Sequence, residues 1–217
     1  MIQKNNITVT CPDCRREFDI RAWSIISAGR PFLRKREVLA GEIFRHTCPH
    51  CGKSNQFAYD CLYSRREFML YLLPTCQGRT LPLSAEEEKV FRRMGRKFPM
   101  RLENTVDGFL DHLRVLEDKY LDKPFELVRE RALQDYRRQQ PQCDRLRYQG
   151  TQNGQILFSA YQRQLKVGET AVDKDLYQRA LHAMQRTEFL SDPPAYIFVD
   201  QTWVRSSAVR QLLDKWF

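Results

Sequence analysis

Cys11-Pro12-Asp13-Cys14 and Cys48-Pro49-His50-Cys51 are two copies of a CPxC motif, and the first third of the chain is built around them. One tight turn of this form can present two thiols to the same ion. Thiolates are soft, compact ligands, and Zn²⁺ favours them in a closed tetrahedron. Two turns supply all four ligands and leave no position for substrate, as in structural zinc sites. The spacing therefore predicts one structural Zn²⁺ per chain, bound by Cys11, Cys14, Cys48 and Cys51.

The sequence around each CPxC predicts that it lies between two strands. Residues 7–10 and 17–23 flank the first copy, and residues 42–47 and 57–62 flank the second. Proline at the second position fixes φ and leaves the following amides free to face the sulfurs. The residue after the second cysteine favours a left-handed backbone in such a turn. Gly52 meets this preference, whereas Arg15 meets it only at a cost of about 1 kcal/mol.

The segment between the two motifs is longer than in compact zinc modules. It holds 33 residues, compared with about 12–20 in such modules. Residues 31–40 are expected to form a short helix that takes up this length, with Pro31 in its first turn and Gly41 just past its end. Residues 68–73 are apolar on both faces, which predicts a strand inside a sheet.

The second half of the chain alternates between helical and strand patterns. Ser84 and Glu87 form a capping box at the start of a helix, and Asn153-Gly154 marks a tight hairpin turn. Residues 104–120 and 123–140 each have one apolar helical face, so we expect them to pack as an antiparallel pair. The expected elements are helices at 84–98, 104–120 and 123–140, strands within about 144–172, a helix at 174–186, and a closing strand and helix.

Several stretches carry a resemblance to a known family. They are CPDC, VLAGEIF at 38–44, CPHCG, Tyr59 with Leu62-Tyr63, and residues 68–74, all in matching order and spacing. In these stretches the chain resembles the CpXC domain family, a prokaryotic family that is named for the two motifs. Residues 116–118 and 144–148 are similar to the region often attached to that domain. The resemblance implies a zinc-ribbon-like fold, the four cysteines as metal ligands and no particular activity.

These features together predict an α+β protein of two domains. Residues 1–79 would form a zinc-ribbon-like antiparallel sheet with an inserted helix. Residues 80–217 would form the helical pair, a small antiparallel sheet and the closing elements.

Composition and charge limit the function classes. The 217 residues carry a net charge of +9, and no apolar run approaches the length of a membrane span. The first ten residues lack the basic and apolar regions of a secretory signal. We therefore expect a cytoplasmic protein, in which CxxC pairs are metal or redox sites rather than structural disulfides. The resemblance to a prokaryotic family implies that this cytoplasm is bacterial.

Redox chemistry is the first alternative for the cysteines. A CPxC at the start of a helix can lower the pKa of its first thiol and attack disulfides. Here Arg15-Arg16-Glu17-Phe18 and Gly52-Lys53-Ser54-Asn55 follow the two motifs, and neither begins an apolar helix. Cys61, Cys76 and Cys143 have no partners at ligand spacing and are expected to be small buried residues.

Nucleic-acid binding is the second alternative. Thirteen Lys and Arg against seven Asp and Glu place most of the excess positive charge in residues 1–79. Basic residues near aromatics can bind phosphates and stack on bases. The candidates are Arg34, Lys35, Arg36, Arg65 and Arg66.

The sequence contains none of the common nucleotide-binding, zinc-protease or serine-hydrolase motifs. We therefore expect a non-catalytic, zinc-binding interaction or scaffold module whose partner is a protein. A thiol oxidoreductase using the CPxC pairs, a hydrolase with a site between the halves and a nucleic-acid-binding zinc ribbon remain as alternatives.

Overall fold

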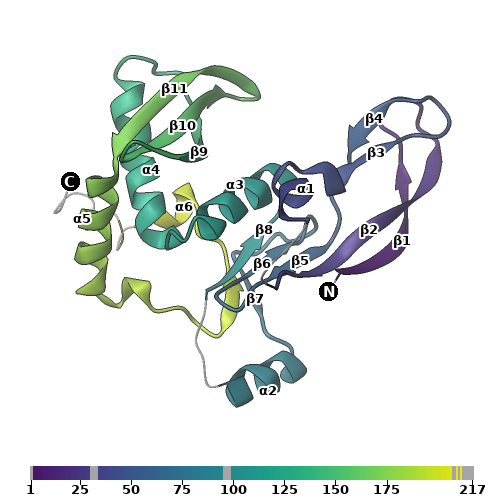
Figure 1. The fold of residues 1–217 in the computed structure, drawn as a ribbon, viewed down its shortest axis with the longest axis horizontal. Helices are drawn as coiled ribbons and strands as arrows, with labels where there is room; N and C mark the ends of the chain where they lie inside the picture. Colours follow the sequence, from purple (N-terminus) through teal and green to yellow (C-terminus); the bar gives the residue numbers. More distant parts are fainter. Residues whose placement is uncertain (1, 30–33, 95–98, 207–208, 210, 212–217) are drawn as a thin grey trace. The chain divides into compact units, whose positions relative to one another are not determined.

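A computed structural model describes residues 2–29, 34–94, 99–206, 209 and 211 (Figure 1). By their contacts the elements form two compact units. Unit 1 comprises Met1–Leu113 and Pro193–Phe198, and unit 2 comprises Arg114–Asp192 and Val199–Phe217. The expected boundary after residue 79 falls inside unit 1, because the strands at 80–82, 100–103 and 195–197 pair into its sheet.

Unit 1 is a mixed sheet with helices and a small separate hairpin. Its described elements are β1 (Ile2–Thr10), β2 (Glu17–Ser27), α1 (Lys35–Leu39), η1 (Glu42–Phe44), β3 (Arg45–Thr47), β4 (Ser54–Gln56), β5 (Cys61–Ser64), β6 (Met69–Leu72), β7 (Thr80–Pro82), α2 (Ala85–Met94), β8 (Met100–Glu103), the start of α3 (Val106–Glu117), and β12 (Ala195–Ile197). The seven-stranded sheet has the order β1-β2-β5-β6-β8-β12-β7, and β3 and β4 form a sheet of their own.

The strand that was expected inside the sheet lies there. β6 pairs antiparallel with β5 and parallel with β8, and Leu70 and Leu72 are fully buried. The sequence analysis did not predict β8. The four residues of β8 include Arg101, whose charged side chain is only 1% exposed. A charged residue at this position is not typical of a buried strand, so the sequence pattern did not indicate one.

The second hairpin differs from its prediction. Residues 42–44 form the 3-10 turn η1 instead of a strand, because Gly41 takes a left-handed backbone with φ of 73° and accepts a hydrogen bond from the amide of Phe44. The return strand β4 lies at 54–56 and not at 57–62. Phe57 donates to the Phe44 carbonyl at 2.8 Å and closes the base of the hairpin. The chain then enters β5 of the large sheet.

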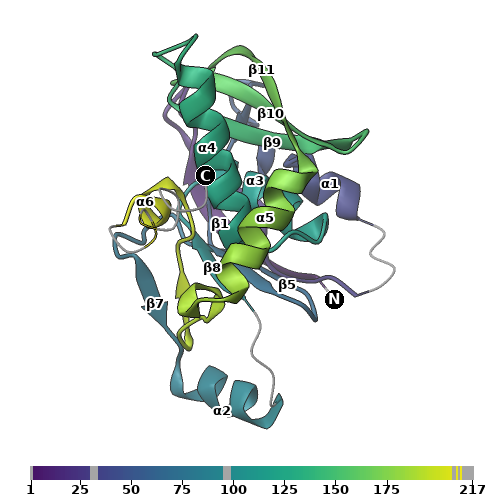
Figure 2. The same cartoon turned by 90° about the vertical axis from the view of Figure 1, so that its left-hand side faces the viewer.

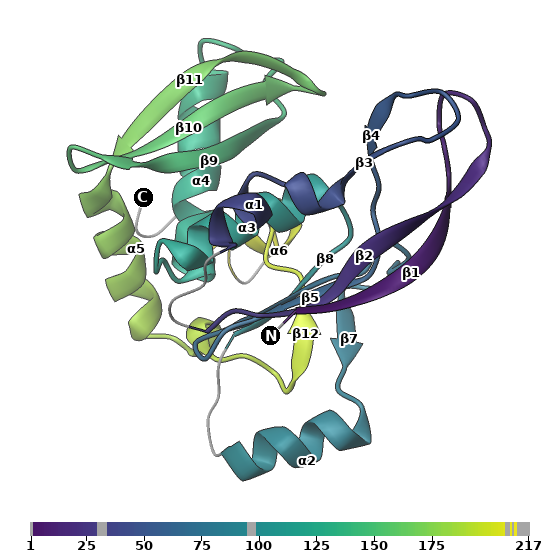
Figure 3. The same cartoon turned by 45° about the vertical axis from the view of Figure 1, so that its right-hand side comes forward.

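α1 and the first part of α3 lie over one face of the sheet of unit 1, whereas α2 lies away from that face, beyond β7 (Figures 1 and 3). α1 ends before the left-handed Gly41, as predicted, whereas Pro31 lies outside the described residues. The first part of α3 packs on the same core, since Phe109 contacts Phe44 edge to face at 5.8 Å. The apolar side chains of α3 are buried as predicted. However, the expected packing of α3 with the next helix as a pair is wrong, because this part of α3 packs in unit 1.

Unit 2 is built on a three-stranded antiparallel sheet, against which α4 (Asp122–Arg137) and α5 (Lys174–Gln185) pack. Its elements are the end of α3, α4, β9 (Arg145–Gln152), β10 (Gln155–Gln162), β11 (Leu165–Asp173), α5, η2 (Glu188–Leu190) and α6 (Gln201–Val204). The sheet has the order β11-β10-β9, which confirms the predicted meander. Asn153 and Gly154 have φ of 51° and 76°, as a tight hairpin turn requires.

The core of unit 2 is aromatic. α4 packs against α5 on one face of this sheet (Figure 2). Phe125 of α4 contacts Tyr148 at 5.1 Å and Phe158 at 5.8 Å, so the helix is held on β9 and β10. Tyr120 and Tyr177 meet edge to face at 4.7 Å. Unit 2 therefore has a hydrophobic core of its own.

Two expected helices extend beyond what the structure describes. The one expected at 84–98 is α2 through Met94, and residues 95–98 lie outside the described set. Residues 207, 208, 210 and 212–217, in the last part of the chain where the closing helix was expected, also lie outside it. Within the described ranges, no helix is long and apolar enough to cross a membrane.

Candidate metal centre

The two CPxC turns have the same backbone hydrogen bonds. In each turn, the amide of the first cysteine donates to the carbonyl five residues later. The amide four residues later donates back to the carbonyl of the first cysteine, and all four bonds are 2.9 Å long. These bonds connect Cys11 with Arg16 and Arg15, and Cys48 with Lys53 and Gly52. The first turn follows β1, and the second lies between β3 and β4.

The residue after each second cysteine has a left-handed backbone. Gly52 has φ of 72° and Arg15 has φ of 60°. Arg15 thus adopts the same left-handed conformation as Gly52, although it has a side chain. A side chain with a Cβ costs about 1–2 kcal/mol in this region. Arg15 is therefore a strained position that the rest of the turn holds in place.

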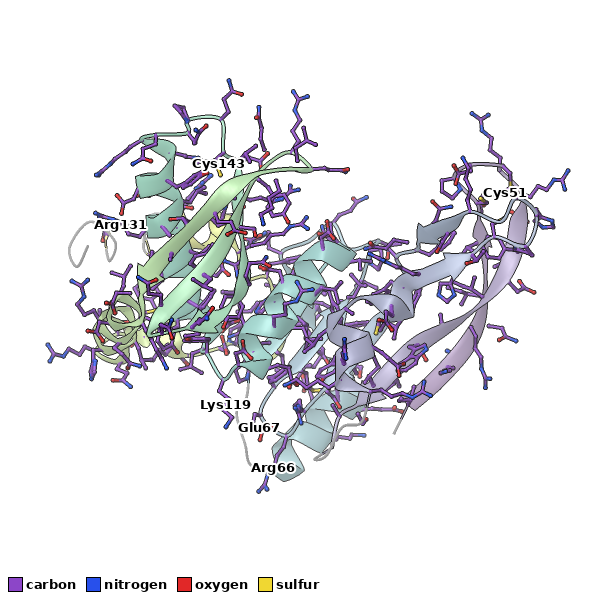
Figure 4. The ribbon with its side chains drawn as sticks, turned by 45° about the horizontal axis from the view of Figure 1, so that its top comes forward. Cys51, Arg66, Glu67, Lys119, Arg131 and Cys143 are labelled. Atoms are coloured by element: carbon purple, nitrogen blue, oxygen red, sulfur yellow. The ribbon has the colours of Figure 1, made fainter. Side chains whose placement is uncertain are left out.

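The turns bring four sulfurs together at the end of unit 1. Sγ of Cys11 lies 3.7 Å from Sγ of Cys51, and Sγ of Cys14 lies 3.7 Å from Sγ of Cys48. All four sulfurs lie within 4.8 Å of one another. A disulfide needs about 2.05 Å, and all seven cysteines of the chain are free thiols. Figure 4 shows Cys51 at this tip.

The sulfur spacing fits a tetrahedral metal. A regular tetrahedron with Zn–S of about 2.3 Å has sulfur–sulfur edges of about 3.8 Å. Two of the separations in the cluster match that edge. Among the residues that the structure describes, these four cysteines form the one group of His, Cys, Asp and Glu side chains arranged to hold a metal ion.

Backbone amides point at the sulfurs, as the proline positions predict. The amides of Cys14 and Asp13 donate to the Cys11 thiolate and lower the pKa of that thiol to about 7. The Lys53 amide favours the thiolate of Cys51, but desolvation and the neighbouring thiols raise its pKa to about 12. One sulfur therefore ionises readily, whereas a cation is needed to offset the repulsion of several thiolates.

The side chains between the cysteines connect the two turns. The Asp13 carboxylate accepts hydrogen bonds from Lys53 Nζ at 2.7 Å and from Asn55 Nδ2 at 2.8 Å. His50 Nε2 lies 3.1 Å from the carbonyl oxygen of Glu17. The sequence analysis assigned no role to these residues. Their only signal was position, since Asp13 and His50 each occupy the x position of a CPxC motif.

The remaining cysteines lie outside the cluster. Cys61 and Cys143 are buried, as expected of small core residues, and burial raises the pKa of Cys61. Cys76 is half-buried and lies near the Gly78 carbonyl at 3.5 Å. None of these three thiols belongs to the four-sulfur group.

One histidine has a partner that the sequence did not indicate. His112 Nδ1 lies 2.8 Å from Glu103 Oε1, and both side chains are nearly buried in unit 1. A carboxylate nine residues away on a different element gives no sequence motif. The pair connects β8 with α3.

The basic candidates for nucleic acid come from two segments, one at α1 and one in the turn between β5 and β6. Arg34 stacks over Trp23 at 5.4 Å and pairs with Glu37 at 3.5 Å. Arg65 donates to the carbonyls of Ala28 and Gly29 at 3.3 and 3.4 Å. Lys35 and Arg36 lie on α1, whereas Arg66 is exposed in the turn between β5 and β6. Nucleic-acid binding by these residues stays a prediction.

The fold and the cluster define a mixed α+β protein with a centre of four cysteines that are arranged to hold a metal ion. A family model described as CpXC protein matches residues 9–129 of this chain. The chain belongs to the CpXC family. The match spans both turns and continues through α3 into α4. No curated protein and no solved structure matches the chain.

Proposed function

We propose that this protein is a zinc-stabilised interaction module, in which Cys11, Cys14, Cys48 and Cys51 hold one Zn²⁺ and the surface around them binds a partner protein. The sulfur separations of 3.7 Å carry the proposal, because they equal the edge of a ZnS₄ tetrahedron within 0.1 Å. Zinc bound by four thiolates has no open coordination position, so it stabilises the fold and activates no substrate.

The turns favour ligation over thiol exchange. A redox CPxC needs an accessible first thiol, usually at a helix start. Here the first cysteine of each motif, Cys11 or Cys48, is fully buried. β2 and β4 follow the two turns, so no helix dipole acts on these sulfurs. A zinc-ribbon-like arrangement of two knuckles accounts for the same features without redox chemistry.

Metal analysis of the full chain, purified without chelator, tests the proposal. We expect close to one zinc per chain, and loss of most of that zinc in Cys14→Ser. Cys76→Ser is the matched control and keeps the metal, since Cys76 lies outside the cluster. Protein without bound metal, or with iron in place of zinc, contradicts the proposal.

A binding assay separates the protein-binding module from a nucleic-acid module. Fluorescence anisotropy with single- and double-stranded oligonucleotides, at 50 and 200 mM salt, measures affinity. We expect no micromolar binding at either salt. Binding that falls steeply with salt and weakens in Arg36→Ala or Arg66→Ala overturns the protein-partner assignment, because phosphate contacts release counterions.

A further inference from the structure

The x-position side chain of each CPxC turn contacts residues that follow the other turn. Asp13, in the first turn, accepts from Lys53 and Asn55, just after the second turn. His50, in the second turn, lies within hydrogen-bonding distance of the Glu17 carbonyl, just after the first. The relation is reciprocal, although residues 33–42 positions apart make these contacts.

These contacts matter because strand pairing does not connect the two turns. β1 and β2 belong to the seven-stranded sheet, whereas β3 and β4 form a separate sheet. The cysteines come two from each hairpin, so a tetrahedral site requires the hairpin tips to stay in register. Within the part of the chain that the structure describes, side chains at 13, 50, 53 and 55 bridge the tips beside the sulfurs.

Asn55 extends the bridge to the sulfur cluster. Its Nδ2 donates to Asp13 Oδ2 at 2.8 Å and lies 4.0 Å from Sγ of Cys11. Asp13 thus fixes the amide that faces a ligand sulfur. Partners that orient a ligand, without touching the metal, commonly change metal affinity.

The geometry points to a cross-turn latch, by which we mean the contacts of Asp13 with Lys53 and Asn55. Asp13 is the positioning residue: it holds Lys53 and Asn55 over the first turn. The latch thereby keeps the four sulfurs at ligand spacing before and after a metal ion binds. This inference rests on the proposed zinc site. The latch slows dissociation of the ion, because one hairpin tip must move away from the other before the ion is released.

The effect of the latch on zinc release is moderate, since Lys53 is largely exposed and exposed ion pairs contribute little to stability. The second bond to Asn55 and the His50 contact add to it. We expect Asp13→Ala to speed zinc transfer to a chromophoric chelator by about three- to tenfold. Asp60→Asn is the matched control, because this exposed carboxylate of unit 1 lies outside the latch.

A charge exchange distinguishes positioning from general damage. Asp13→Lys places two cations side by side and should speed zinc release more than Asp13→Ala. The double variant Asp13→Lys with Lys53→Asp restores an opposite pair and should recover at least part of the wild-type rate. Denaturation of unit 2 should stay unchanged in every variant, since the substituted residues lie in unit 1.

The outcomes separate the latch from the zinc site itself. If the wild type holds one zinc and Asp13→Ala releases it at the wild-type rate, the latch is overturned and the zinc site stands. The same holds if the charge exchange gives no recovery. If the wild type binds no zinc, the proposed function fails first, and the metal analysis shows this independently.

Discussion

Arg15 is the one residue of the metal centre whose backbone does not suit its side chain. Its φ of 60° matches Gly52 in the second turn. We expect Arg15→Gly to raise the free energy of unfolding of the zinc-loaded protein by about 1 kcal/mol, because glycine has no Cβ to strain. Urea denaturation measures the change. The reverse substitution in the second turn, Gly52→Ala, should lower the free energy of unfolding by a similar amount. Equal stabilities in both variants would contradict backbone strain at Arg15.

At the level of single residues, spacing predicted which four cysteines lie together but not the side chains that support them. Cys11, Cys14, Cys48 and Cys51 share a motif, and the left-handed position after each turn follows from its chemistry. Lys53 and Asn55 act through contacts with Asp13, some 40 residues away in the chain. A single sequence carries no signal for such pairs, since exposed polar residues near a turn are common.

Gly41 fixes the junction between α1 and η1. Its φ is 73°, and a Cβ there would lie 2.7 Å from Leu110 Cδ1. We expect Gly41→Ala to destabilise the protein by about 1–3 kcal/mol, because strain and overpacking act together. Gly29→Ala is the control, since a Cβ there meets nothing within 4 Å. Thermal unfolding of both variants provides the comparison, and equal midpoints would argue against a special role of Gly41.

The start of α5 depends on one side chain. The Asp173 carboxylate accepts from the Asp175 amide at 2.8 Å and caps the helix. Asp173→Ala should lower the free energy of unfolding by about 1 kcal/mol. Asp173→Asn keeps a hydrogen-bond acceptor and should lower it much less. Chemical denaturation distinguishes the two, and identical losses would mean that the cap bond contributes nothing.

Among the elements, local signals predicted the hairpins and most helices. Asn153-Gly154, the capping residues and the apolar helical faces all act over a few residues. β8 and η1 were missed for different reasons. β8 exists because β6 and β12 lie on either side of it, and a partner brought from a distant part of the sequence leaves no local pattern. η1 depends on the left-handed Gly41, which the sequence indicated only as a helix end.

The two units have separate cores, and the metal centre lies in unit 1. Removing zinc with a strong chelator should therefore destabilise unit 1 and spare unit 2. Hydrogen exchange followed by mass spectrometry should show lost protection in β1 to β4 and retained protection in β9 to β11 and α5. Loss in both units together would show that they unfold as one cooperative structure.

For the whole molecule, the predicted order of helices and strands was more accurate than the predicted boundary between the two domains. A break after residue 79 followed the change from a cysteine-rich segment to a helical one. The division by contacts places residues 80–113 and 193–198 with the first unit. Which distant strand pairs with which sheet is set by tertiary packing, and composition along the chain does not report it.

β12 has a consequence for the protein's synthesis. It lies between β8 and β7 in the sheet of unit 1, although residues 104–194 separate it from β8 along the chain. The ribosome delivers β1 to β8 first, then residues 114–192 of unit 2, and only then residues 195–197. The sheet of unit 1 is therefore incomplete, with β7 unpaired, until β12 has been synthesised. Residues 114–192 contain the three strands of unit 2 with α4 and α5, and they can begin to fold before that sheet is complete.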